Sequence, residues 1–179
     1  MTGVQTCALP ISNDDRNAFY YGRELYFYGQ YDTAARELKR YLKLPNATWA
    51  PERAAAMRFI AKSLPNESEQ WLLKAVAEAP GRREALVDLA KLYYERKDWK
   101  KSLRYAEEAL SIEEKPLEYL CEAEAWGWMP WDHAAIAAYN LEKYDDALMY
   151  GTKALSLKPS DARLSQNLSF YVSAISPSS

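Results

Sequence analysis

The chain repeats one helix–turn–helix pattern, and this repetition limits the folds that it can adopt. The segment 83–116 contains two amphipathic stretches joined by a short polar turn at 96–98. In the first stretch, Leu86, Leu89 and Tyr93 fall on one face of a helix with 3.6 residues per turn. A helix that is apolar on one face needs a partner to cover that face. We therefore predict two helices packed against each other.

The same pattern occurs four times along the chain. Counting back 34 residues from Trp99, at the start of a second helix, reaches Pro65 and then Tyr31, and counting forward 45 reaches Tyr144. The four units that align in this way are 15–48, 49–82, 83–116 and 128–161.

Two positions in the unit are small in every repeat. The position on the first helix is occupied by Gly22, Ala56, Ala90 and Ala135. The position on the second helix is occupied by Ala34, Ser68, Ser102 and Ala147. A position that stays small in four units indicates a helix crossing that is too close for a larger side chain.

A 34-residue helix–turn–helix period with these small positions resembles the tetratricopeptide repeat. The resemblance covers about Arg16 to Tyr171 and implies an all-α fold, an α-solenoid of four tetratricopeptide-like helix pairs. The longer last interval places an insertion at 117–127, before the fourth pair, where Glu118–Glu124 forms either a helical extension or a short extra turn. Asp161 is placed to cap a last helix at 161–173, the capping helix of the solenoid.

The first twelve residues, 1–12, fit nothing in the repeat pattern. They look like a non-native segment of the kind that metagenomic assembly leaves behind. We therefore expect a tetratricopeptide repeat domain at 13–175 that is the C-terminal fragment of a larger bacterial protein.

Composition excludes several classes of function. The net charge is −2 with a pI of about 5.6, which argues against general nucleic-acid binding. No apolar run approaches the roughly 18 residues of a membrane span. Cys7 and Cys121 lie far apart and form no disulfide framework or metal-binding spacing, so we expect a reducing, cytoplasmic location.

The chemical motifs of enzymes are not found in the sequence. We find no Gly-rich phosphate loop, paired-His zinc motif or nucleophile elbow. His133 is the only histidine. With Cys121 or Glu122 it would supply at most half of a metal site, and it has no partner in the sequence pattern for acid–base chemistry. We therefore expect no catalytic residue, no cofactor and no metal in this chain, and no enzymatic activity of its own.

The resemblance to tetratricopeptide repeats implies an inner groove lined by the first helices. The candidate groove residues are Arg23, Tyr26, Arg53, Lys91, Tyr94 and Tyr139. Its three basic residues would form a ladder beside the tyrosines, which predicts binding of an extended protein or peptide segment that is acidic or bears carboxylates. The alternative is a solvated face without a ligand.

A second, narrower resemblance concerns the insertion. The run that contains Cys121, Glu122, Ala125, Trp126 and Gly127 is similar to the C-terminal repeats of bacterial family-two glycosyltransferases. The chain departs from that family's pattern at Ala123, which is usually Pro, and at Trp131, which is usually Tyr. The resemblance implies an upstream catalytic domain that uses a nucleotide sugar, none of whose acidic residues is present here.

Two functions of different classes follow. The first is a protein-interaction or scaffolding module. The second is an accessory region of such an enzyme that binds the acceptor or mediates dimerisation. The insertion would then dock the catalytic domain or a second subunit through Cys121, Glu122, Trp126, Trp128 and Trp131. The tryptophans could stack on sugar, but packing against neighbouring repeats is the interpretation that we favour.

Overall fold

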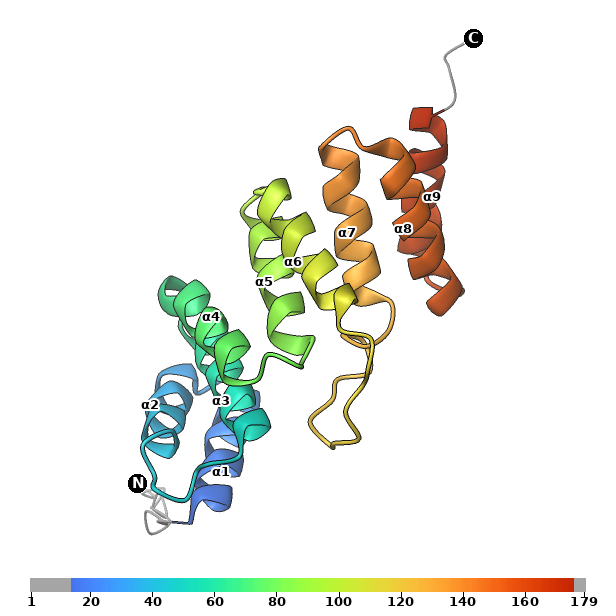
Figure 1. Cartoon of the computed structure of the whole chain (residues 1–179). Helices are drawn as coiled ribbons and strands as arrows, with labels where there is room; N and C mark the ends of the chain where they lie inside the picture. The colour runs from blue at the N-terminus through green and yellow to red at the C-terminus, as the bar shows by residue number, and fades with distance from the viewer. Residues whose placement is uncertain (1–13, 176–179) are drawn as a thin grey trace, which may run out of the picture.

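A computed structural model describes residues 14–175 of the chain, and its regular structure is helical throughout (Figure 1). The segment at 1–12 that we interpreted as non-native lies outside the described residues. The first two pairs are α1 (Asp15–Phe27) with α2 (Tyr31–Tyr41), and α3 (Ala50–Ser63) with α4 (Ser68–Glu78) after a 3₁₀ turn at Pro65–Glu67. The others are α5 (Glu84–Glu95) with α6 (Trp99–Ser111), α7 (Met129–Asn140) with α8 (Tyr144–Leu157), and the single α9 (Ala162–Ile175).

The helix pairs stack side by side into an elongated solenoid (Figure 1). Each helix packs against the next one along the chain, and the first helices of successive pairs also contact one another: α1 with α3, α3 with α5, and α5 with α7. Within the described residues, the backbones of the second helices α2, α4, α6 and α8 do not approach one another in this way, and only side chains link them, as Lys39 does with Trp71 and Tyr150 with Glu107. The stack therefore curves toward the first helices, whose side we call the inner face. The predicted all-α solenoid of four pairs is confirmed.

The repeated small positions lie at the helix crossings. The first-helix residues Gly22, Ala56, Ala90 and Ala135 are all buried. A Cβ atom added to Gly22 would lie 2.6 Å from Cγ of Leu38, which is itself fully buried. In the third pair the hydroxyl of Ser102 donates a hydrogen bond of 2.9 Å to the carbonyl of Ala90, so the two small positions touch each other. Of the second-helix residues, only Ser68 is half-buried, because it begins α4.

The turns within the pairs use one backbone conformation at one repeat position. Gly29, Lys97 and Glu142 all have positive φ, of 74°, 57° and 61°. Gly29 and Lys97 are separated by two repeats of 34 residues, and Glu142 follows Lys97 by the interval of 45. A residue in the left-handed region commonly ends a helix. In the second pair the equivalent position, Ser63, is still inside α3, and a 3₁₀ turn replaces the left-handed residue.

The insertion contains no helix. The chain between the end of α6 at Ser111 and the start of α7 at Met129 forms turns and bends. The prediction of a helical extension at Glu118–Glu124 is therefore wrong, and the alternative of an extra turn is correct.

The last helix, α9, is capped as predicted. The Asp161 carboxylate accepts hydrogen bonds from the backbone amides of Arg163 and Leu164, which confirms its predicted role as the cap of α9.

Replacing Gly22 by valine tests the tight crossing of the first pair. Because the new side chain would collide with buried Leu38, we expect Gly22→Val to lower the free energy of unfolding by about 1–3 kcal/mol. The matched control is Gly81→Val, where an added Cβ meets nothing within 4 Å and the change should stay within about 0.5 kcal/mol. Urea unfolding of both variants measures the difference, and equal losses would contradict a crossing limited by size.

Candidate protein-binding groove

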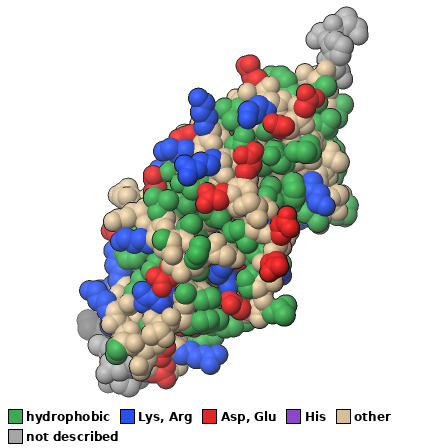
Figure 2. All heavy atoms as spheres, viewed as in Figure 1, with side chains coloured by type: hydrophobic (Ala, Val, Ile, Leu, Met, Phe, Trp, Pro, Cys, Tyr) green, Lys and Arg blue, Asp and Glu red, His purple; other side chains and the backbone are tan. Residues whose placement is uncertain are grey.

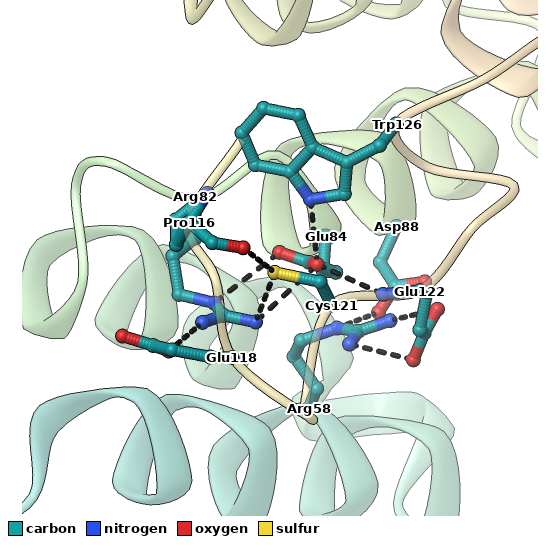
Figure 3. A network of polar contacts seen from close by, with 9 residues as sticks. All are labelled: Arg58, Arg82, Glu84, Asp88, Pro116, Glu118, Cys121, Glu122 and Trp126. Atoms are coloured by element: carbon teal, nitrogen blue, oxygen red, sulfur yellow. Dashed lines mark hydrogen bonds and ion pairs between the residues drawn. The ribbon is translucent and has the colours of Figure 1, made fainter. Parts of the chain in front are cut away.

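The insertion lies on the inner face of the stack and covers part of it. From the end of α6 the insertion runs back along the stack before it returns to α7 (Figure 1). Its residues form hydrogen bonds with side chains of α1, α3 and α5. Two buried arginines, Arg58 of α3 and Arg82 just before α5, receive the carboxylates of Glu122 and Glu118 (Figure 3). The groove expected along the inner face is thus already occupied, at its N-terminal half, by the chain itself.

Arg58 uses all three guanidinium nitrogens in this network. Its Nε donates to the Asp88 carboxylate of α5 over 2.6 Å, and its two terminal nitrogens donate to the two oxygens of Glu122 over 2.8 and 3.0 Å (Figure 3). The second interaction is bidentate, the geometry in which a guanidinium binds a carboxylate most strongly. Arg58 is only 6% exposed, so its charge depends on these partners.

Glu84, at the start of α5, collects three donors on one oxygen. Its Oε1 accepts hydrogen bonds from the indole Nε1 of Trp126 over 2.9 Å, from the backbone amide of Glu122 over 3.1 Å, and from Arg82 over 3.4 Å (Figure 3). Arg82 also donates to Glu118 and to the sulfur of Cys121. The buried Glu84 carboxylate therefore holds both the backbone and the indole of the insertion.

Aromatic residues hold the far end of the insertion on the first two pairs. The Tyr119 hydroxyl donates to the buried Glu52 carboxylate over 3.1 Å and accepts from the Tyr20 hydroxyl over 3.3 Å. The Tyr119 ring lies 5.6 Å from the ring of Trp49. Glu52 in turn accepts a 2.9 Å hydrogen bond from Tyr41 of α2. The insertion thus bridges side chains of α1, α3 and α5.

The charges of the network shift one another's pKa values. Burial alone would raise the pKa of Asp88 and of Glu122, but the neighbouring Arg58 guanidinium outweighs it and holds both pKa values below the usual range. Burial disfavours the charged form of Arg58 as well, yet Asp88 and Glu122 raise its pKa. All three side chains are therefore charged at neutral pH.

Two hollows remain open on the inner face. The polar hollow, of about 490 Å³, borders the insertion and is lined among others by Tyr26, Lys62, Asp88, Lys91, Glu95, Glu122 and Glu124. The apolar hollow, of about 220 Å³, lies between α5, α7 and α9. It is lined by Tyr94, Ile136, Tyr139, Arg163, Asn167, Phe170 and Tyr171.

The predicted basic ladder is not formed. Arg53 lines neither hollow, because its guanidinium binds Glu78 of α4 and the carbonyls of Leu42 and Ala47, which ties the first pair to the second. Arg23 lies against the Tyr20 ring and Glu24, and lines neither hollow. The sequence analysis did not identify Arg58, which binds the Glu122 carboxylate of the insertion.

The other candidate groove residues divide between the two hollows. Tyr26 and Lys91 line the polar hollow, where the Lys91 ammonium lies 3.9 Å from Glu95. Tyr94 and Tyr139 line the apolar hollow. Charged side chains of both signs are spread over the face seen in Figure 2 rather than gathered in a patch of one sign.

The predicted docking residues also separate into two groups. Cys121, Glu122 and Trp126 belong to the network on Arg58, Arg82 and Glu84. The other two tryptophans pack on the last pairs, Trp128 with the Lys158 ammonium 4.2 Å above its ring and Trp131 with its ring 6.0 Å from that of Tyr150. No stacking surface shared by the three tryptophans is formed.

Sequence reasoning missed the residues that receive the insertion, namely Arg58, Arg82, Glu84 and Asp88. One signal was present: Arg58 interrupts the apolar run 54–61, where a buried charge needs a partner. The partners lie 30 and 64 residues away, and helical periodicity does not relate such positions.

The comparisons with known proteins bear on the fold. The crystal structure of MamA protein superposes with a TM-score of 0.67 at 18% identity, covering 89% of this chain and 81% of that one. A MamA variant gives a TM-score of 0.63 at 16% identity, covering 89% and 86%. The chain has this tetratricopeptide-like helical fold. No protein-family model and no curated protein matches the chain, so the resemblance to family-two glycosyltransferases stays a prediction.

Residues 14–175 contain neither a metal-binding group of side chains nor a membrane-spanning helix. No three His, Cys, Asp or Glu side chains among them are grouped so as to hold a metal ion. In the same part of the chain, no helix has both the length and the apolar character required to cross a bilayer.

Acid should weaken the attachment of the insertion. Because the pKa of Glu122 is lowered in the folded chain, its contribution is present above the unfolded value near 4 and is lost as pH falls through the folded value. We expect Glu122→Gln to be less stable than wild type at pH 7 and the difference to shrink toward pH 3. Urea unfolding across this range measures it, with exposed Glu124→Gln as the control that keeps the wild-type profile. Parallel curves for Glu122→Gln and wild type would contradict the pairing.

Loss of the indole N–H donor should lower the free energy of unfolding more at Trp126 than at Trp128. Trp126→Phe leaves the Glu84 carboxylate, 2% exposed, short of one hydrogen bond, at a cost of about 1–3 kcal/mol. Trp128→Phe makes the same change where the ring faces Lys158, at a cost of about 1 kcal/mol or less. Thermal and urea unfolding of both variants check this order, and a larger loss for Trp128→Phe would reverse it.

Proposed function

We propose that the chain is a protein-interaction module that binds an extended segment of a partner protein in the apolar hollow between α5, α7 and α9. The observation that carries the proposal is the grouping of accessible aromatic and aliphatic side chains in that hollow. Phe170 is 51% exposed and Tyr94 38% exposed, with Ile136 and Tyr139 half-buried between them. Aromatic residues in a concave surface are typical of binding sites for peptide side chains.

The charges around the hollow favour an apolar anchor over an acidic one. Arg163, the only cation that lines it, is held by Asp132 through two hydrogen bonds of 3.1 and 2.8 Å, so its charge is neutralised. Asn167 offers amide groups to the backbone of a bound segment. We therefore propose a partner segment with one large apolar residue, in place of the acidic segment expected from the basic ladder.

The neighbouring polar hollow supports the same choice. Four carboxylates line it, from Asp88, Glu95, Glu122 and Glu124, against the ammonium groups of Lys62 and Lys91. Asp88 and Glu122 are paired with Arg58, and Lys91 lies 3.9 Å from Glu95, so the lining holds no excess of positive charge for a strongly acidic segment. A neutral or mildly basic continuation of the segment suits the lining better.

Selection from a displayed library of random peptides tests this function. We expect wild type to enrich peptides that share an apolar residue. Ile136→Glu should weaken the binding of those peptides at least about tenfold, because the hollow would then carry a desolvated charge. Titration calorimetry on the enriched peptides measures the effect.

The matched control introduces the same charge outside the hollow. Leu157→Glu changes an exposed aliphatic residue of α8 that lines neither hollow, and it should leave the affinity of the enriched peptides unchanged. Peptides that bind Ile136→Glu as tightly as wild type, or the failure of any peptide to enrich, would refute the proposed site.

A further inference from the structure

We propose that Arg58 and Arg82 form a binding site for an acidic extended segment, which the chain's own residues 118–122 occupy and which an acidic segment of a partner protein takes over when they are released. The insertion thus acts as an intramolecular competitor. This site is separate from the apolar hollow proposed above, and it lies on α3 and α5 rather than on α7 and α9.

The receiving side of the site is held in place independently of the insertion. Arg58 is fixed by Asp88, and Arg82 lies 3.3 Å from the buried Glu84 carboxylate. These four side chains belong to α3, α5 and the loop between α4 and α5, and these elements also contact one another directly. Release would leave two oriented guanidinium groups with free donors, which are suited to carboxylates.

The occupying segment has no regular structure of its own, and Leu120 is its one side chain that packs on the core cluster of the first two pairs. It contains no helix, and the Leu117 side chain at its tip is fully exposed. The Glu122 side chain is 51% exposed although it binds Arg58. Segments with few buried apolar contacts and accessible polar contacts open at a lower free energy than the core does.

A second anchor limits how far the insertion can move. Ala125 is 2% exposed and packs with Leu86, Val87 and Trp126 in the core of the third pair. Residues 118–122 can therefore leave Arg58 and Arg82 while the end of the insertion stays attached. They remain at a high effective concentration, which a free peptide must overcome in the wild-type chain.

The ligand chemistry can be read from the occupant. Glu118 and Glu122 place two carboxylates four residues apart on the two arginines, and Tyr119 adds an aromatic ring whose hydroxyl donates to Glu52. An extended peptide with two carboxylates at this spacing and an aromatic residue beside the first fits the same contacts.

Peptide binding in trans tests the site. The probe is a fluorescent peptide with the sequence of residues 113–124, with serine in place of the cysteine, and its anisotropy is measured with three proteins. We expect Glu118→Gln/Glu122→Gln, in which the internal carboxylates are neutralised, to bind the probe at least about tenfold more tightly than wild type. The control Glu113→Gln/Glu124→Gln removes the same charge from exposed positions and should bind like wild type.

Further readings separate the possible outcomes. A probe carrying Gln at both carboxylate positions should not bind. Adding Ile136→Glu to the released variant, Glu118→Gln/Glu122→Gln, should leave binding of the probe unchanged, even if that change abolishes binding at the apolar hollow. Equal binding of the probe by wild type and Glu118→Gln/Glu122→Gln would overturn the proposal. Dimerisation of wild type that Glu118→Gln/Glu122→Gln abolishes would also overturn it, because a second copy would then be the occupant.

Hydrogen exchange keeps the proposal testable if the released variant fails to fold. In wild type the amides of residues 118–122 should exchange through local opening, at least about tenfold faster than the slowest amides of α3 and α5. Exchange of these amides only through global unfolding would overturn the proposal.

Discussion

The middle of the structure depends on the ion pairs that the buried Arg58 guanidinium makes with Asp88 and Glu122. A charge in that position needs carboxylates from outside its own helix, and it finds one on α5 and one on the insertion. The contact between α4 and α5 is the least extensive between consecutive helices along the stack. The ion pair from Arg58 to Asp88 and the insertion that crosses both α3 and α5 therefore join the second pair to the third.

The stack itself could be predicted from the sequence because its determinants are local and periodic. Gly22, Ala56, Ala90 and Ala135 recur because the same crossing recurs, and each must be small for the same steric reason. The turn positions of the first, third and fourth pairs repeat in register as well, although the third and fourth use Lys97 and Glu142 where the first uses glycine. Lysine and glutamate adopt the left-handed conformation only at an energetic cost, so their presence at these positions does not indicate a turn in the sequence.

The occupied site could not be predicted in the same way. Periodicity indicates the face on which a residue lies, but Arg53 and Arg58 are five residues apart and thus about 140° apart around α3. The sequence analysis assigned Arg53 to the groove, but the side of α3 that carries Arg58 is the one that faces the inner face. The position of the insertion depends on pairings such as Glu122 with Arg58, which link residues 64 apart and leave no periodic trace. The sequence analysis expected a partner's acidic segment on Arg23, Arg53 and Lys91, whereas the carboxylates found on the inner face belong to the chain itself and lie on Arg58 and Arg82.

The insertion therefore closes the inner face over Arg58 and Arg82, and the face stays open at the polar hollow and at the apolar hollow between α5, α7 and α9. The most direct test of this arrangement is a double-mutant cycle between Arg58→Met and Glu122→Gln, measured by urea unfolding at pH 7. The account predicts that the two losses are not additive, with a coupling energy of about 1 kcal/mol or more, since the residues share a bidentate contact. Additive losses, with a coupling energy near zero, would show that the insertion does not rest on Arg58 and would contradict the account.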